Sequence, residues 1–366
     1  MLVTTVKAPS PLEPSPSQPD GLPVYPNLVA DLLQVQVHPN DTVAHVLATC
    51  AGYAYERVDS ARTKDGGSTF SETMARLGLE GNRCRIVADY VDGMLLWSTA
   101  FILQSQDGRI GILAYRGTEP TNLLNWFAVA DIEPEEFKIC VGNEQDPKNY
   151  FDVHAGFYRN TRATSDKIVE ILRAALQPAT NEGAVNILGE RDRQVQPLER
   201  LYITGHSYGA AIASMMGIML KNNARYRDIG QILHAVYTFG QPMIGSPALA
   251  LACKRHEFLG RNVIRYVYRN DPVPRLPPST SGHFAHYPEH ELRYSRKWPW
   301  IESPASSQTN DLFIAPEALL GFVERQMWLL RHLHPQYSVV DHLPQNYIAA
   351  LIPPGIRNEF GELPLP

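Results

Sequence analysis

The stretch from Leu201 to Ala213, "LYITGHSYGAAIA", restricts the possible folds of this chain more than any other segment. The residues before Gly205 have the apolar character of a buried strand, whereas small residues follow Gly209 at the start of a helical pattern. The two glycines around Ser207 allow the strand to turn sharply into the helix. A strand joined so tightly to a helix indicates a fold in which strands and helices alternate.

The same alternation continues along the chain. Apolar runs predict strands, and helical spacing of apolar residues predicts helices, the first of them capped by Asp41. The predicted strands are 84–91, 94–105, 109–117, 201–204, 233–240 and 263–270, with "DGR" at 107–109 as a hairpin turn, and the predicted helices are 42–56, 68–79, 156–176 and 208–221. This pattern predicts an α/β fold with a mostly parallel central sheet and helices on both faces.

The expected domain organisation is simple. Residues 1–28 are rich in Pro and Ser and are expected to form an extended arm rather than a packed element. Residues 29–366 contain no strong linker, so we expect a single domain. The N-terminus lacks the basic start and apolar stretch of a signal peptide, which favours a cytoplasmic protein or one exported without a cleaved signal.

Composition argues against several classes of protein. Of the 366 residues, 44% are hydrophobic and 19% are charged, as in a globular chain with a sizeable core. The formal net charge of −5 argues against a nucleic-acid partner, and no apolar run approaches the roughly 20 residues of a transmembrane helix. The cysteines are widely spaced without a C-x-x-C pair, so we expect free thiols and no metal or other cofactor.

Ser207 is a candidate nucleophile because its strand–turn–helix context matches a nucleophile elbow. The alternative is a silent serine in a tight turn. A serine at its ordinary pKa needs a base, which a carboxylate in turn orients. Asp271 follows the predicted strand 263–270 and is therefore the candidate acid, although an aspartate before a proline is also a common turn former.

The base cannot be chosen from residue chemistry alone. The candidates are His283, His286, His290, His332, His334 and His342. "HYPEH" at 286–290 matches the zinc-hydrolase pattern H-x-x-E-H, but Pro288 would break the helix that this pattern requires. His332 and His334 fall at the end of a predicted helix, which leaves His342 or His286 as the favoured base.

Seven motifs in order along the chain resemble the class 3 lipase family, a branch of the α/β-hydrolases. They are "AYRGTEP" at 114–120, "NWFAVAD" at 125–131, "VHAGFY" at 153–158, "GHSYGAA" at 205–211, "TFGQPMIG" at 238–245, "RNDPVPRLPP" at 269–278 and "VDHLPQNY" at 340–347. The resemblance implies that Ser207 is the nucleophile, Asp271 the orienting acid and His342 the general base. It also implies that His286 supports the loop near the acid.

The resemblance further implies an oxyanion hole built from Thr118, through its backbone N–H and hydroxyl, and from the backbone N–H of Tyr208. Tyr208 departs from the family pattern, which has a smaller aliphatic residue at this position. Its ring could therefore narrow the site that receives the acyl group.

Two apolar segments have open roles. Residues 121–131 would form a short helix, which the resemblance identifies as a lid with the acyl-binding candidates Leu123, Leu124, Trp126 and Phe127. A buried core helix is the alternative. A helical insertion at about 296–338, longer than the family minimum, includes a predicted helix at 316–333. This helix could be an extra core helix, or it could dock on a membrane or contribute to the acyl pocket.

These observations predict a serine ester hydrolase that cleaves lipid esters through an acyl-enzyme, with its substrate at a lipid–water interface. One alternative is a phospholipase, including an exported effector that damages membranes. Another is a lipase-like scaffold that binds partners without catalysis.

Overall fold

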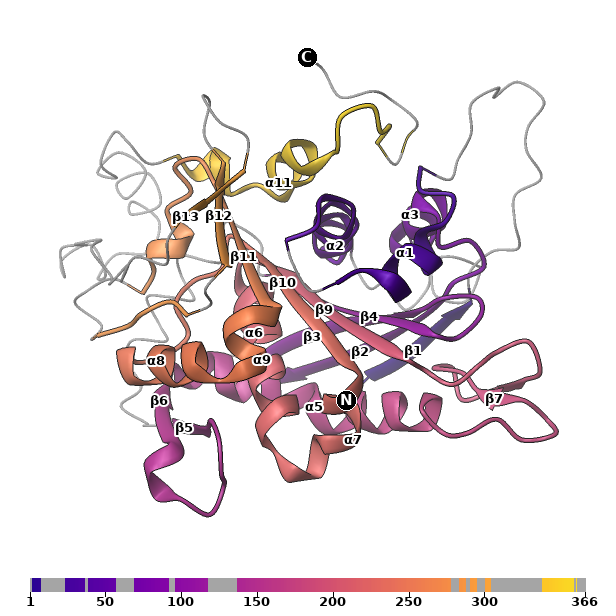
Figure 1. Cartoon of the computed structure of the whole chain (residues 1–366), viewed down its shortest axis with the longest axis horizontal. Helices are drawn as coiled ribbons and strands as arrows, with labels where there is room; N and C mark the ends of the chain where they lie inside the picture. The colour runs from indigo at the N-terminus through magenta and orange to yellow at the C-terminus, as the bar shows by residue number, and fades with distance from the viewer. Residues whose placement is uncertain are drawn as a thin grey trace.

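The computed structural model describes residues 2–7, 24–36, 39–56, 69–91, 96–117, 137–277, 283–287, 290–294, 300–303, 338–358 and 360. Within these residues the chain builds a nine-stranded sheet in the order β1-β2-β3-β4-β9-β10-β11-β12-β13 (Figure 1). The strands are β1 (Leu2–Lys7), β2 (Arg83–Val91), β3 (Leu96–Gln104), β4 (Ile110–Tyr115), β9 (Arg200–His206), β10 (Leu233–Phe239), β11 (Val263–Tyr268), β12 (His290–Tyr294) and β13 (Ile301–Ser303).

The centre of this sheet is parallel. Strands β4, β9, β10, β11 and β12 pair in parallel, whereas β1, β2 and β3 pair antiparallel on one side and β13 does so on the other. The predicted hairpin joins β3 to β4, with Gly108 in the left-handed region at φ 92°. The α/β fold with a mostly parallel central sheet is thus confirmed.

Helices cover both faces of the sheet (Figure 1). One face carries α1 (Leu28–Gln34), α2 (Asp41–Tyr53), α3 (Thr69–Leu77) and α11 (Pro344–Leu351), and the other carries α5 (Ala155–Ala175), α6 (Tyr208–Asn222), α7 (Arg227–Ile232), α8 (Pro247–Arg255) and α9 (Glu257–Asn262). Two buried hydrophobic clusters correspond to these two faces. The sheet therefore needs apolar residues at successive positions of each central strand.

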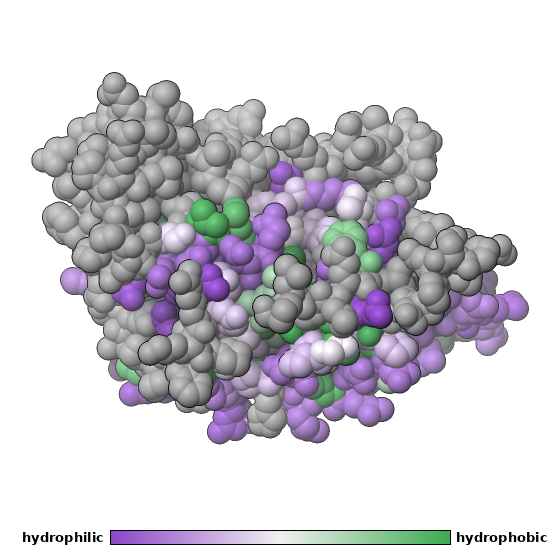
Figure 2. All heavy atoms as spheres, turned by 90° about the horizontal axis from the view of Figure 1, so that it is seen from above, coloured by the Kyte–Doolittle hydropathy of each residue, from purple (hydrophilic) through white to green (hydrophobic). Residues whose placement is uncertain are grey.

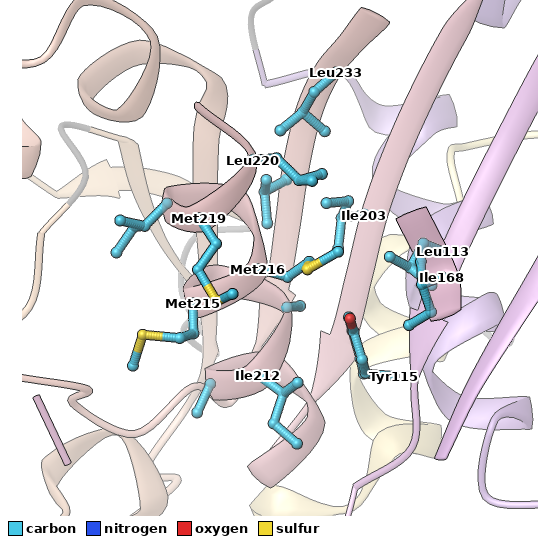
Figure 3. Packing of buried hydrophobic residues seen from close by; sticks show 14 of the residues in the cluster. Leu113, Tyr115, Ile168, Ile203, Ile212, Met215, Met216, Met219, Leu220 and Leu233 are labelled. Atoms are coloured by element: carbon cyan, nitrogen blue, oxygen red, sulfur yellow. The ribbon is translucent and has the colours of Figure 1, made fainter. Parts of the chain in front are cut away.

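Strand β9 shows why this pattern of apolar residues arises. Its successive residues Leu201, Tyr202 and Ile203 are all fully buried, with Leu201 and Ile203 in one cluster and Tyr202 in the other. Figure 3 shows Ile203 near Met216 of α6, within the packing between this helix and the sheet. The strand is held by burial on both sides, which makes its C-terminal end a rigid base for the following turn.

Three local predictions need correction or extension. Asn40, not Asp41, caps α2, because the Asn40 side chain accepts a hydrogen bond from the Val43 N–H. Residues 2–7 pair with β2 and so extend the sheet, which corrects the arm predicted for residues 1–28 over this part. The polar connection 177–199 contains the two short strands β7 (Ala184–Val185) and β8 (Arg191–Asp192).

Other predictions concern bonding and membrane crossing. All four cysteines are free, and three of them, Cys50, Cys84 and Cys253, are buried. None of the helices in the described ranges has the length and apolarity to cross a bilayer. The helix predicted at 316–333 lies outside the described residues.

Candidate active site

Ser207 occupies the sharp turn between β9 and α6. Its backbone has φ 59° and ψ −127°, a conformation that residues with a side chain rarely adopt. The Ser207 N–H donates to the Phe239 carbonyl at 2.9 Å, so the end of β10 holds the strained turn in place. Ser207 itself is 1% exposed.

The two flanking glycines are required by close backbone contacts. A Cβ atom at Gly205 would lie 2.3 Å from the Gly209 carbonyl oxygen, and one at Gly209 would lie 2.3 Å from the Tyr115 carbonyl oxygen. Neither neighbour is a side chain that could rotate away. The Gly-x-Ser-x-Gly spacing is therefore a steric consequence of packing this turn against itself and against the end of β4.

Asp271 follows β11 and has a full set of hydrogen-bond donors. One carboxylate oxygen accepts from the Val273 N–H at 2.9 Å. The other accepts from His342 Nδ1 at 2.8 Å and from the Tyr347 hydroxyl at 2.5 Å. The acid is 3% exposed, and a buried carboxylate of this kind needs such donors to offset its loss of hydration.

His342 belongs to a short 3-10 helix, Val339–His342, directly before α11. Two hydrogen bonds join this segment to Asn270, the residue before Asp271. The Ser338 N–H donates to the Asn270 carbonyl, and the Asn270 N–H donates to a side-chain carboxylate oxygen of Asp341. The ring of His206, from β9, lies 4.6 Å from the His342 ring. The histidine is thus positioned by two other parts of the chain, the loop of the acid and β9.

The second ring nitrogen of His342 and the hydroxyl of Ser207 are suited to proton transfer. Because Nδ1 of His342 donates to Asp271, a neutral His342 presents Nε2 as an acceptor. Within the described ranges, both His342 Nε2 and Ser207 Oγ are buried and make no hydrogen bond. A base oriented by a carboxylate and a hydroxyl on a strained turn are the parts required to activate a serine nucleophile.

The other histidine candidates occupy different environments. The His286 ring nitrogen Nε2 donates to the Pro274 carbonyl at 2.5 Å, in the loop that follows Asp271. Burial lowers the pKa of His286 well below its usual range, so it remains neutral. His290 lies in β12 rather than on a helix and pairs with Glu302, whereas His283 is exposed.

Two predicted candidates are absent from this set, because His332 and His334 lie outside the described residues. Across the described part of the chain, no group of three or more His, Cys, Asp or Glu side chains could hold a metal ion. Among the described candidates, His342 is the histidine that the structure brings to Asp271.

Tyr208 answers one question that the sequence raised. Its side chain is 2% exposed, and its ring centroid lies 5.5 Å from that of Phe157 in α5. The ring is therefore part of the buried hydrophobic cluster on this face of the sheet, where it packs against Phe157 of α5. Thr118 and the lid candidates Leu123, Leu124, Trp126 and Phe127 lie in 118–136, outside the described residues.

Tyr347 is a residue of the site that the sequence analysis did not single out, although "VDHLPQNY" contains it. Its hydroxyl donates to Asp271 and accepts from the Tyr268 N–H at 3.1 Å. The sequence offered one indication of this role, because Tyr347 lies in the first turn of the helix that follows His342. Its partner, 76 residues away, could not be read from the sequence.

The parallel sheet, the strained serine turn between a strand and a helix, and the acid at the end of a later strand define an α/β-hydrolase fold. Solved structures agree with this class. A lipase from Rhizopus microsporus var. chinensis is 18% identical, with a TM-score of 0.51 over 83% of this chain and 85% of that one. Lipase II from Rhizopus niveus is 19% identical, with a TM-score of 0.50 over 83% and 92%.

Within this class, residues 112–281 match the family described as Lipase (class 3). A triacylglycerol lipase OBL1 of Arabidopsis thaliana is 28% identical over 52% of this chain and 38% of its own length. The secreted mono- and diacylglycerol lipase A of Penicillium cyclopium is 24% identical over 64% and 62%. The chain thus matches less than two thirds of the length of either relative.

Proposed function

We propose that this protein is a serine ester hydrolase that cleaves lipid esters through an acyl-enzyme. The observation that carries the proposal is the buried Asp271–His342 hydrogen bond, with the His342 ring centroid 4.6 Å from that of His206, the residue before the strained Ser207. The family match supports the same activity, and the names of the two relatives favour acylglycerols as the substrate class.

In the proposed mechanism, Ser207 Oγ attacks the ester carbonyl while His342 Nε2 takes its proton. Asp271 stabilises the imidazolium that forms and holds its orientation. His342 then gives the proton to the leaving alcohol. In the second half of the reaction, water attacks the acyl carbonyl carbon while His342 takes a proton from it. His342 returns this proton to Ser207 Oγ as the carboxylic acid leaves. Water is the second substrate of this mechanism, which uses no cofactor.

The oxyanion would be held by the backbone N–H of Tyr208, in the first turn of α6, and by Thr118. The N-terminus of α6 supports this role, because the positive end of the helix dipole lies at this turn. Each such donor contributes about 3 kcal/mol to the transition state.

The proposed partner is a lipid ester at a lipid–water interface. In this proposal the segment 121–131 is a lid over the active site. Val340, two residues before His342, exposes 64% of its surface and offers one apolar contact near the site. The face in Figure 2 carries hydrophobic spots between hydrophilic residues in its described part. For location, a cytoplasmic protein or one exported without a cleaved signal remains our proposal.

Three variants test the mechanism on p-nitrophenyl esters, triacylglycerols and phospholipids. Ser207→Ala and His342→Ala are expected to lose at least about 10³-fold in kcat, because the nucleophile and the base act as a unit. His286→Ala is the matched control, since it removes a half-buried histidine that contacts the acid loop but not Asp271. Retained hydrolysis in Ser207→Ala would refute the proposal, and loss only in His286→Ala would refute the choice of base.

The substrate panel separates the remaining functions. Hydrolysis of phospholipid without triacylglycerol would identify a phospholipase, whereas failure of a fluorophosphonate probe to label Ser207 would favour a binding scaffold.

A further inference from the structure

Gly240 directly follows β10 and lies against the proposed acid and base. It is buried, and its backbone is in the left-handed region at φ 59°. A Cβ atom at this position would lie 2.8 Å from Oδ2 of Asp271 and 3.0 Å from both Nδ1 and Cε1 of His342. Oδ2 and Nδ1 are the two atoms that the hydrogen bond of this pair joins. A side chain at residue 240 would therefore meet both ends of this hydrogen bond.

The backbone of Gly240 is held in place by the sheet and by the serine turn. The Gly240 N–H donates to the Tyr266 carbonyl of β11 at 3.1 Å. The carbonyl of the preceding residue, Phe239, accepts from the Ser207 N–H at 2.9 Å. Phe239 is also paired in register with residues of both β9 and β11. Moving Gly240 away from the acid and base would therefore disturb the sheet and the turn of the nucleophile.

The acid and the base are also unable to move away freely. A close contact with the end of a side chain is relieved easily only if that side chain can rotate. Oδ2 of Asp271 also accepts from the Tyr347 hydroxyl at 2.5 Å, and Oδ1 accepts from the Val273 N–H at 2.9 Å. The His342 ring is confined as well, with the ring centroid of His206 4.6 Å away. The observed geometry of the pair therefore requires that residue 240 has no side chain.

We propose that Gly240 is a positioning residue, which sets how Asp271 and His342 approach each other and where both lie relative to Ser207. This inference rests on the proposed function. Gly240 transfers no proton and forms no bond to the substrate. It acts because the consecutive residues Phe239 and Gly240 contact the serine turn and the acid–base pair, respectively. Such positioning matters because a misplacement of about 1 Å can lower the rate about 100-fold.

Gly240→Ala tests the proposal because it adds a single methyl group beside the Asp271–His342 hydrogen bond. We expect kcat to fall by about 10- to 100-fold, because the carboxylate and the imidazole must move apart. KM should stay within about threefold of the parent, since the pair contributes to the transition state rather than to substrate binding. The rate of fluorophosphonate labelling of Ser207 should fall by a similar factor to kcat.

Gly189→Ala is the matched control. Gly189 is also in the left-handed region, at φ 87°, but a Cβ atom there would have no neighbour within 4 Å. This variant therefore introduces the backbone strain of an alanine at positive φ without a contact to the site. It should leave kcat and KM unchanged. A Gly240→Ala variant with the same kcat as Gly189→Ala would overturn the inference.

A double-mutant cycle tests whether Gly240 acts through the acid. Asp271→Ala removes the carboxylate that the added methyl group would meet. In this background, Gly240→Ala should slow the labelling of Ser207 by less than about twofold, because the interaction that it disturbs is already lost. The same loss in both backgrounds would contradict a role through Asp271.

Thermal unfolding of each variant keeps the test decisive if Gly240→Ala does not fold. In that case, a folded double variant of Gly240→Ala and Asp271→Ala would support the proposed contact, and an unfolded one would overturn it.

Ser207→Ala separates the inference from the proposed function. An inactive Ser207→Ala, together with a Gly240→Ala that matches Gly189→Ala in kcat, overturns the inference and leaves the proposed function standing. An active Ser207→Ala overturns the proposed function itself.

Discussion

Tyr347→Phe provides a quantitative test of how the acid of the site is held. The substitution removes one hydroxyl that donates to Asp271 at 2.5 Å and accepts from the Tyr268 N–H at 3.1 Å. Burial and the neighbouring Asp271 raise the pKa of Tyr347 well above its usual range, so the hydroxyl is a donor throughout the ordinary pH range. The variant therefore breaks two buried hydrogen bonds at once, although Asp271 keeps His342 and the Val273 N–H as donors.

The expected magnitude follows from these two losses. A hydrogen bond to a charged group contributes about 1.5–3 kcal/mol, and an ordinary hydrogen bond such as the one from the Tyr268 N–H contributes about 0.5–1.5 kcal/mol. We therefore expect a loss of about 2–4.5 kcal/mol in the free energy of unfolding. The matched control is Tyr287→Phe, which removes a buried hydroxyl paired with the neutral Ser214 hydroxyl at 2.6 Å and should cost about 1 kcal/mol.

Urea unfolding at neutral pH measures both variants, with kcat followed in parallel. Because Asp271 keeps His342 and the Val273 N–H, Tyr347→Phe should retain more activity than Asp271→Ala. Equal stability losses in Tyr347→Phe and Tyr287→Phe would refute the argument that the charge on Asp271 makes this hydroxyl special.

Two further predictions concern stability. Gly205→Ala and Gly209→Ala should each lower the free energy of unfolding by about 3 kcal/mol or more, because the added methyl would lie 2.3 Å from a backbone oxygen. Gly111→Ala is the control and should cost less, because its methyl meets a Leu198 methyl at 3.1 Å. Equal thermal midpoints of the three variants would contradict this prediction. Stability should also fall as the pH drops from about 6.5 towards 4, because burial lowers the pKa of His45 and His154 to about 4. The unfolded chain then binds protons that the folded chain does not, and each histidine costs about 2 kcal/mol at pH 5. Urea unfolding at pH 7 and pH 5 checks this, and equal stabilities would exclude it.

The sequence by itself determined the features that depend on neighbouring residues. Apolar runs located the central strands, and the small residues around Ser207 located the sharp turn, because both depend on local backbone geometry. The end of a parallel strand also identified Asp271. Local rules have limits even here. Asn40 and Asp41 are both good helix caps, and only the structure shows that Asn40 accepts the hydrogen bond.

Only the tertiary structure decided which distant groups meet. Six histidines were compatible with the role of base, and the fold brings His342 to Asp271 across 71 residues. Tyr347 reaches the same carboxylate across 76 residues, and Tyr55 reaches His206 across 151. The physical reason is that a backbone turn is selected by the space available to its own residues, whereas a buried hydrogen bond is selected by how the helices and strands pack around it.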